Sequence, residues 1–192
     1  MASSPPRSRN AAATRDAILE SAIRNFARAG YDGVGVREIA GDAGVTAMLV
    51  NRYFGSKELL FAEAVETSFA PPVFIADKPE SVARDAAMAL VARSAVDAND
   101  LAPFLIMVRS ASNPRSAEIV RGAIERHVGK RLARQLPEPG RQLRSDVALS
   151  VISGVLLMRR VVGTRALNGR NTVQLAELLE AVFDAIIDTD LG

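Results

Sequence analysis

The residues best suited to chemistry stand together at positions 47 to 52 of the chain. Arg52 carries a guanidinium that can donate two hydrogen bonds to a guanine, and Asn51 can pair with an adenine or bind a phosphate. Beside them stand Ala47, Met48 and Leu49, whose apolar side chains can contact the methyl group of thymine. If one helix presents these side chains together, the stretch is suited to reading base pairs.

Two short helices joined by a sharp turn are predicted to position this stretch. Val36, Ile39 and Ala40 share one face at helical spacing. Gly44 then supplies the left-handed backbone conformation through which the chain leaves one helix and enters the next at a steep angle. This pattern is typical of a helix-turn-helix, which places its second helix in the DNA major groove.

The second helix is expected to have a buried and an exposed face. Its spacing turns Val50 and Phe54 inward, which leaves Met48 and Arg52 facing outward. An exposed face this apolar is unusual for a helix in water, and it favours a position in the major groove. Thr46 is placed to cap this helix, because its hydroxyl can accept a hydrogen bond from a backbone N–H of the first turn.

A further cation follows at the start of the next helix. Gly55 and Ser56 end the second helix of the motif, and Lys57 begins the helix that follows it. The N-terminus of a helix carries a partial positive charge, which together with the Lys57 ammonium suits a phosphate. We therefore expect Lys57 to bind the DNA backbone.

The sequence shows no pattern typical of catalysis or metal binding. The chain has no Cys and a single histidine, His127, so a zinc site has no set of Cys and His ligands. Ser153 and Gly154 lack the first glycine of a nucleophile elbow, and the glycines at 33 and 35 lack the third glycine of a dinucleotide fingerprint. We therefore expect no enzyme, no cofactor and no metal.

The composition favours an all-helical chain. Of 192 residues, 48% are hydrophobic and only 5% are aromatic, a balance that favours helices packing through small side chains. The net charge of +2 is too small to indicate nucleic acid by itself. The absence of Cys fits a reducing cytoplasm.

The first ten residues are predicted to be a disordered basic tail. This part of the sequence is rich in Ser, Pro and Arg, and Arg7, Arg9 and Arg15 precede the first acid. Such an arm can add contacts to phosphates or to the minor groove, with a merely solvated tail as the alternative. No apolar run marks a signal peptide or a membrane anchor.

Two helices near the C-terminus, at about 145–164 and 172–189, are predicted to pair two copies of the chain. The uncharged run between Asp146 and Arg159 is too short to span a bilayer at ~1.5 Å per residue. It is apolar around most of its circumference, so more than one side must be covered. The final helix carries an apolar stripe opposite its acids. Both patterns suit a symmetric four-helix dimer interface, with an ordinary core within one chain as the alternative.

Four segments in a fixed order carry a resemblance to a known family. They are FARAGY at 26–31, VREIA at 36–40, AGVT at 43–46 and YFGSKELL at 53–60. Together they resemble the DNA-binding domain of the TetR family of bacterial transcriptional repressors.

The chain departs from the family pattern at four positions. Val34 and Gly35 replace the usual pair of Thr or Ser residues, so the first helix of the motif is expected to lack its hydroxyl cap. Met48 and Asn51 replace a small residue and a tyrosine.

The resemblance implies a role for each candidate residue. Those that would contact phosphates or adjacent base edges are Arg37, Thr46, Tyr53 and Lys57. Those that would read the sequence are Ala47, Met48, Leu49 and Arg52. The resemblance also implies a dimer that pairs through its last two helices. Its two recognition helices would lie about 34 Å apart on a palindromic operator of double-stranded DNA.

The resemblance further implies a pocket among the middle helices for an unknown small-molecule effector, whose binding would weaken operator binding. The side chains suited to line it are large or adaptable, and they are Phe69, Met88, Phe104, Met107, Arg109, His127 and Met158. Arg109 and His127 are candidates to recognise an acid group on the ligand. For the apolar members, a place in the ordinary core is the alternative.

We therefore predict an all-α chain of about nine helices in three parts. These are a tail at 1–10, a three-helix DNA-binding domain at 11–55, and a larger helical domain for effector binding and dimerisation at 56–192. The predicted function is a homodimeric, ligand-responsive repressor in the bacterial cytoplasm. The alternative is a helical interaction protein, or an enzyme, that carries a borrowed three-helix domain.

Overall fold

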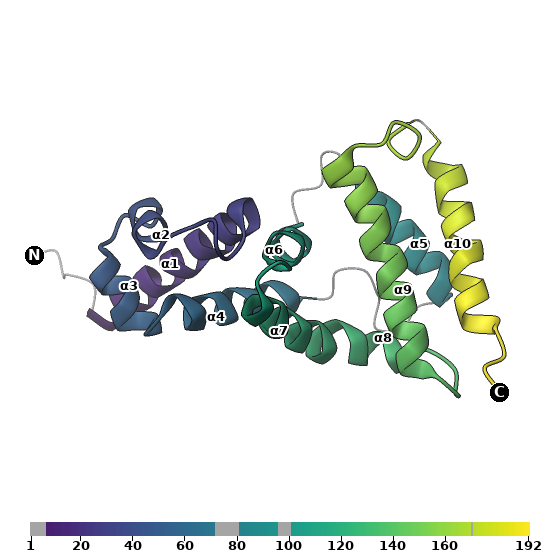
Figure 1. The fold of residues 1–192 in the computed structure, drawn as a ribbon, viewed down its shortest axis with the longest axis horizontal. Helices are drawn as coiled ribbons and strands as arrows, with labels where there is room; N and C mark the ends of the chain where they lie inside the picture. The colour runs from purple at the N-terminus through teal and green to yellow at the C-terminus, as the bar shows by residue number, and fades with distance from the viewer. Residues whose placement is uncertain (1–6, 72–80, 96–100, 170) are drawn as a thin grey trace, which may run out of the picture. The chain divides into compact units, whose positions relative to one another are not determined.

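The computed structural model describes residues 7–71, 81–95, 101–169 and 171–192, and every secondary-structure element in these ranges is a helix (Figure 1). The predicted all-α fold is thereby confirmed. The chain forms two units, Met1–Ala70 with Ala102–Ala123, and Pro71–Leu101 with Ile124–Gly192. None of the described helices combines the length and the apolar character that crossing a membrane requires.

The first unit is built around α1, Arg7–Ala29, which packs against four other helices of this unit. The segment predicted to be a disordered tail, residues 1–10, overlaps α1 at residues 7–10. Residues 1–6 of that segment lie outside the described part. The other helices of the unit are α2 (Val36–Asp42), α3 (Ala47–Phe54), α4 (Lys57–Phe69), α6 (Ala102–Ser110) and α7 (Pro114–Ala123).

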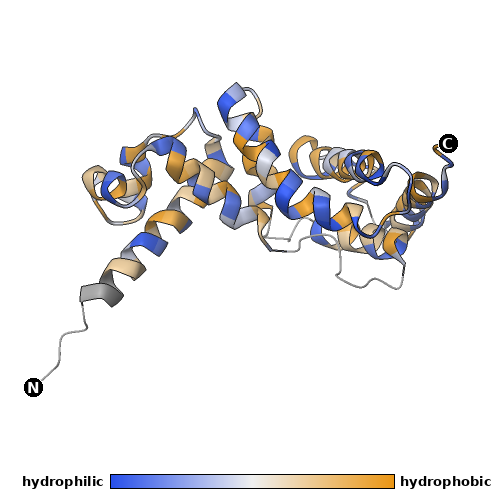
Figure 2. Cartoon of the chain, turned by 90° about the horizontal axis from the view of Figure 1, so that it is seen from below, coloured by the Kyte–Doolittle hydropathy of each residue, from blue (hydrophilic) through white to orange (hydrophobic). Residues whose placement is uncertain are grey.

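An apolar core holds these helices together. Hydrophobic and hydrophilic residues alternate along α1 in the pattern of an amphipathic helix (Figure 2). Its buried side supplies Ile18 and Phe26, while α2 supplies Ile39 and α4 supplies Leu60 and Phe61, and all five are completely buried. Burying each such side chain contributes roughly 1.5–3 kcal/mol to folding.

The C-terminal end of α6 is hydrogen-bonded to the segment that connects α1 to α2. The Ser110 hydroxyl accepts a hydrogen bond from the Tyr31 backbone N–H at 3.1 Å, and the Arg109 guanidinium donates to the Ala27 carbonyl. Gly30 permits this approach: its φ is +73°, and a Cβ at this position would lie only 2.2 Å from the Arg109 carbonyl oxygen. The chain that leads into the helix-turn-helix is therefore fixed by a helix far away in the sequence.

The second unit is a helical bundle in which α10 packs against both α5 and α9. The two C-terminal helices lie close to the predicted ranges, because α9 continues into a short π-helical segment, η2. The elements of this unit are α5 (Val82–Arg93), η1 (Ile124–Gly129, also π-helical), α8 (Lys130–Ala133), α9 (Arg141–Leu156), η2 (Leu157–Val162) and α10 (Thr172–Asp188).

Two buried arginines satisfy carbonyl groups at helix ends in this unit. Arg144 donates to the carbonyls of Ile186 and Thr189 at 2.5 and 2.6 Å, at the C-terminus of α10. Arg159 donates to the Val91 carbonyl at 3.1 Å, near the C-terminus of α5. Cations are favourable at the negative end of a helix dipole. Burial, together with neighbouring Arg160, lowers the pKa of Arg159 below its usual value.

Candidate nucleic-acid interface

Two glycines and a serine delimit the recognition helix α3. Gly44, with φ of +69°, makes the predicted turn between α2 and α3, and Gly55, with φ of +81°, ends α3. Both conformations lie in the left-handed region that favours glycine. The Ser56 hydroxyl then caps α4 by accepting a hydrogen bond from the Leu59 N–H at 3.1 Å. The helix-turn-helix and the start of α4 thus follow from local sequence signals.

The predicted hydroxyl cap at Thr46 is wrong. Thr46 does occupy the N-cap position of α3 with an extended backbone, but its side chain makes no capping hydrogen bond. The residue is exposed, so its hydroxyl is free to face a phosphate. The expected lack of a hydroxyl cap on α2 is confirmed, because Gly35 occupies that N-cap without a side-chain bond.

Helix α3 has the buried and exposed faces that its spacing predicts. Val50 and Phe54 are buried, with 1% and 6% of their surface exposed, whereas Met48 is 81% exposed. Asn51 and Arg52 are also exposed. The other candidates on this helix are partly buried, and they are Ala47, Leu49 and Tyr53. A long apolar side chain therefore projects from the surface beside a guanidinium and an amide.

Three cations at this motif form no ion pair with any described residue. They are Arg37 on α2, Arg52 on α3 and Lys57 at the first position of α4. Arg37 and Arg52 are exposed, and Lys57 is partly buried. Unpaired cations beside an apolar reading face suit the phosphates that flank a major groove.

Other arginines in the same unit are held by acids. Arg15 pairs with Glu63 at 2.6 Å, and Arg115 pairs with Glu58 at 2.9 Å. The Arg15 guanidinium also lies 4.7 Å from the centroid of the Phe54 ring, so it braces the last residue of α3 from α1. These two arginines join helices of the unit to one another, whereas Arg37, Arg52 and Lys57 have no such acid partner in the described part of the chain.

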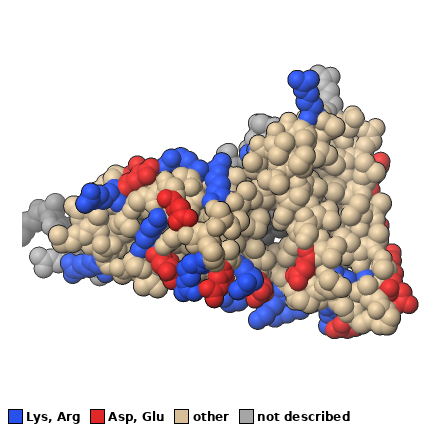
Figure 3. Space-filling view, viewed as in Figure 1, with Lys and Arg blue, Asp and Glu red and all other residues tan. Residues whose placement is uncertain are grey.

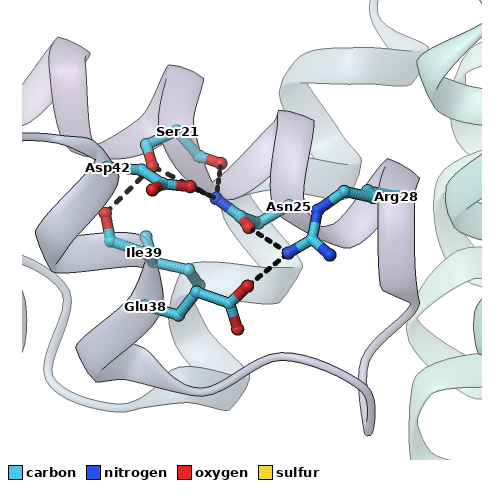
Figure 4. Close-up of polar contacts among 6 residues, drawn as sticks. All are labelled: Ser21, Asn25, Arg28, Glu38, Ile39 and Asp42. Atoms are coloured by element: carbon cyan, nitrogen blue, oxygen red, sulfur yellow. Dashed lines mark hydrogen bonds and ion pairs between the residues drawn. The ribbon is translucent and has the colours of Figure 1, made fainter.

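A buried polar network attaches α2 to α1 (Figure 4). The Ser21 hydroxyl donates to the Ile39 carbonyl at 2.9 Å. The Asn25 amide nitrogen donates to the Asp42 carboxylate at 2.8 Å and to the Ser21 carbonyl at 3.0 Å. Arg28 extends the network to the surface, because it donates to the Asn25 amide oxygen at 2.9 Å and pairs with Glu38 (Figure 4). The angle at which α2 enters the motif is thereby fixed.

Removing the centre of this network should destabilise the protein measurably. Asn25 is 98% buried and joins three partners, so Asn25→Ala should lower the free energy of unfolding by about 1–3 kcal/mol. Urea denaturation at one fixed protein concentration measures this change.

The matched control is Glu38→Ala, which removes only the exposed ion pair with Arg28. Exposed pairs contribute about 1 kcal/mol or less, so this variant should lose little stability. If Asn25→Ala were no less stable than Glu38→Ala, the network would not be what holds α2 in place.

The structure also brings to this motif residues that the sequence interpretation missed. Ser21 and Asn25 stand four residues apart on the buried face of α1, and two polar residues at that spacing on an apolar face were an available signal. Tyr31 gave no such signal. Its ring centroid lies 4.4 Å from the Lys57 ammonium.

The residues proposed for an effector pocket are distributed over both units. In the first unit, Phe69 and Phe104 are buried and Met107 is partly buried, on the packed helices α4 and α6. Arg109, in the same unit, donates a hydrogen bond to the Ala27 carbonyl.

In the second unit, Met88 and Met158 are 58% and 38% exposed. His127 is partly buried in η1.

A small apolar cavity of about 10 Å³ lies within the second unit. None of the seven proposed residues lines it, and small-molecule sites usually measure about 300–1,000 Å³. Its lining residues are Val82, Ala86, Leu132, Leu136, Ala148, Ile152, Phe183, Ile186 and Ile187. Nor do the described residues contain a group of three or more His, Cys, Asp or Glu side chains that is able to hold a metal ion.

Comparison with known protein families gives two matches that follow one another along the chain. Residues 18–64 match the family of bacterial regulatory proteins described as tetR. Residues 80–187 match the tetracyclin repressor-like C-terminal domain. The first match contains the helix-turn-helix, and the second contains α9 and all but the last residue of α10.

Two curated relatives are similar to part of the chain. The HTH-type transcriptional regulatory protein RaaS of Mycobacterium tuberculosis is 38% identical over 102 residues, which cover 46% of this chain and 48% of RaaS. The HTH-type transcriptional repressor NicS of Pseudomonas putida is 36% identical over 64 residues, or 33% of this chain and 30% of NicS. The chain thus matches about half the length of RaaS and less than a third of NicS.

Solved structures resemble the whole fold. A TetR-family regulator from Streptomyces coelicolor has 23% identity and a TM-score of 0.58, and the match covers 98% of this chain and 100% of that one. The multidrug binding protein EbrR, solved in complex with ethidium, has 18% identity and a TM-score of 0.69, with 92% and 99% covered. At these identities the likeness concerns the fold. Because the C-terminal family model alone matches more than half of the chain, the chain belongs to the TetR family of bacterial transcriptional regulators.

Proposed function

We propose that this regulator is a homodimeric repressor that binds a two-fold symmetric DNA operator and releases it when a small molecule binds. The observation that carries the proposal is the exposed face of α3. Met48 is 81% exposed, and the neighbouring cations Arg37, Arg52 and Lys57 have no acid partner among the described residues. A surface that is both apolar and cationic suits the thymine methyls and phosphates of a major groove.

The candidate residues divide into two roles in this proposal. Ala47, Met48 and Leu49 contact thymine methyl groups, Arg52 forks onto a guanine, and Asn51 pairs with an adenine or a phosphate. The residues that bind phosphates or adjacent base edges are Arg37, Thr46, Tyr53 and Lys57. Phosphate contacts fix the register of the protein on the duplex, and base contacts give the specificity.

The exposed apolar face of the C-terminal helices supports the dimer. On α10, Leu178 is 66% and Val182 is 42% exposed, and their spacing of four residues places them on one face. On α9, Leu143 is 59% and Val147 is 42% exposed. Figure 3 shows a broad area with few charged side chains over this part of the second unit. A second copy that covers this area by two-fold symmetry forms the four-helix interface.

Two-fold pairing determines the form of the operator. Each subunit contributes one recognition helix, so the two half-sites form an inverted repeat with centres about 34 Å apart. The small-molecule response is proposed because EbrR, which shares the fold, is a multidrug binding protein solved with ethidium. The effector of this chain is expected to lower its affinity for the operator.

Selection from a random DNA library tests the proposal. Duplexes that the purified protein retains at about 0.15 M salt should converge on an inverted repeat whose half-sites lie one helical turn apart. The same repeat should occur upstream of the gene that the protein represses. Recovery of duplexes without a common sequence, or of a single unrepeated site, would contradict it.

A further inference from the structure

Lys57 occupies an electrostatically unfavourable position in the free protein. It is the first residue of α4, where the helix dipole presents partial positive charge. No described acid pairs with Lys57. The carboxylate of the adjacent Glu58 forms an ion pair with Arg115 at 2.9 Å instead. At the N-terminus of α4, the Lys57 ammonium therefore gains little from the charges around it. An interaction with an uncharged group is then what can favour this position.

The ring of Tyr31 contacts the Lys57 ammonium. The Lys57 nitrogen lies 4.4 Å from the centroid of this ring, within the range of a cation–π interaction. Tyr31 stands at the corner between α1 and α2, so the contact connects this corner to the start of α4.

The ring is itself held firmly. It stacks on Phe26 with the ring centroids 6.3 Å apart, and it meets Phe61 edge to face at 5.0 Å. Its backbone N–H is bonded to the Ser110 hydroxyl of α6. Burial and the nearby acids Glu58 and Asp32 raise the pKa of the Tyr31 phenol, so the ring stays neutral at physiological pH.

We propose that Tyr31 is a positioning residue for DNA binding, which holds the Lys57 ammonium at the N-terminus of α4 so that it meets a phosphate in a prepared position. This role rests on the proposed function. A free lysine loses much side-chain freedom when it binds. A lysine already held against an aromatic ring loses less, and this preorganisation strengthens binding.

The test changes the electrons of the ring and keeps its shape. Tyr31 is replaced by phenylalanine, and then by phenylalanines that carry one, two and three ring fluorines. Fluorine withdraws electron density from the ring face and weakens the cation–π interaction. The affinity for the inverted-repeat duplex is measured for each protein, and again in a Lys57→Met background. The thermal unfolding midpoint of each protein controls for the fold.

The expected result depends on Lys57. Tyr31→Phe should bind like the unsubstituted protein, and the affinity should then fall with each fluorine to a total of about 2- to 30-fold per subunit. In the Lys57→Met background the same series should be flat. Equal losses in both backgrounds would overturn the proposal, because the ring would then act through packing alone.

Two further outcomes would also overturn it. An affinity that does not change along the series would show that the ring contact is absent from the complex. An affinity that rises with fluorination would show that Tyr31 holds Lys57 back from DNA. Both leave the proposed function intact, since the unsubstituted protein still binds. If the unsubstituted protein bound no DNA, the proposed function would fail first and this role with it.

Discussion

Replacing Arg52 with alanine should weaken operator binding by roughly 2–6 kcal/mol in the dimer, since a bidentate contact to guanine contributes about 1–3 kcal/mol in each half-site. The loss should be specific to sequence. Arg52→Ala should tolerate any base at one position of each half-site, and its binding to unrelated DNA should change far less. Fluorescence anisotropy with the selected operator and with single-base variants of it measures both effects.

Arg121→Ala provides the matched control. Arg121 is exposed on α7 in the same unit and forms no ion pair with a described residue, so its removal changes the net charge by the same amount. This variant should keep the specificity of the unsubstituted protein. Equal losses for Arg52→Ala and Arg121→Ala would reduce the role of Arg52 to bulk charge.

A charge placed on the apolar face of α10 should separate the dimer. Leu178 is 66% exposed in the single chain, so Leu178→Glu leaves the fold of the subunit intact. In the symmetric interface two carboxylates enter an apolar surface, which is strongly unfavourable without partners. Sedimentation should show monomers. Operator affinity should fall about 10²- to 10⁴-fold, because the two half-sites are then bound by separate subunits and the gain from linking the two recognition helices is lost.

Met88→Glu is the control for this experiment. Met88 is 58% exposed on α5, so the same acid enters an exposed apolar position outside α9 and α10. This variant should remain a dimer and bind the operator. A Leu178→Glu protein that stays dimeric would show that the two copies pair elsewhere.

The helix-turn-helix could be predicted from the sequence because its signals are local. The left-handed turn at Gly44, and the inward faces of Val50 and Phe54, need only backbone conformation and helical spacing. The hydroxyl cap at Thr46 was mispredicted because it depends on more than backbone conformation and helical spacing. Sequence identifies a residue that is able to cap, but the side-chain rotamer decides whether the hydroxyl bonds the backbone or faces solvent.

Contacts between distant parts of the chain could not be predicted in this way. Tyr31 meets Lys57 across two intervening helices, and its N–H meets Ser110 from much later in the sequence. Periodicity assigns a face to a helix, but it does not name the helix that covers that face. The effector residues show the same limit, because they were chosen by side-chain type, and Met88 and Phe104 belong to different units.

Methyl NMR of the methionines tests the central claim most directly. The chain has five methionines, of which Met48 alone lies on α3, while Met88, Met107 and Met158 report on other helices. When the selected operator is added to protein with ¹³C-labelled methionine methyls, the account predicts that the Met48 signal shifts most and shows contacts to thymine methyl protons. Specific binding of the operator with an unchanged Met48 signal would contradict the claim that this face of α3 reads DNA.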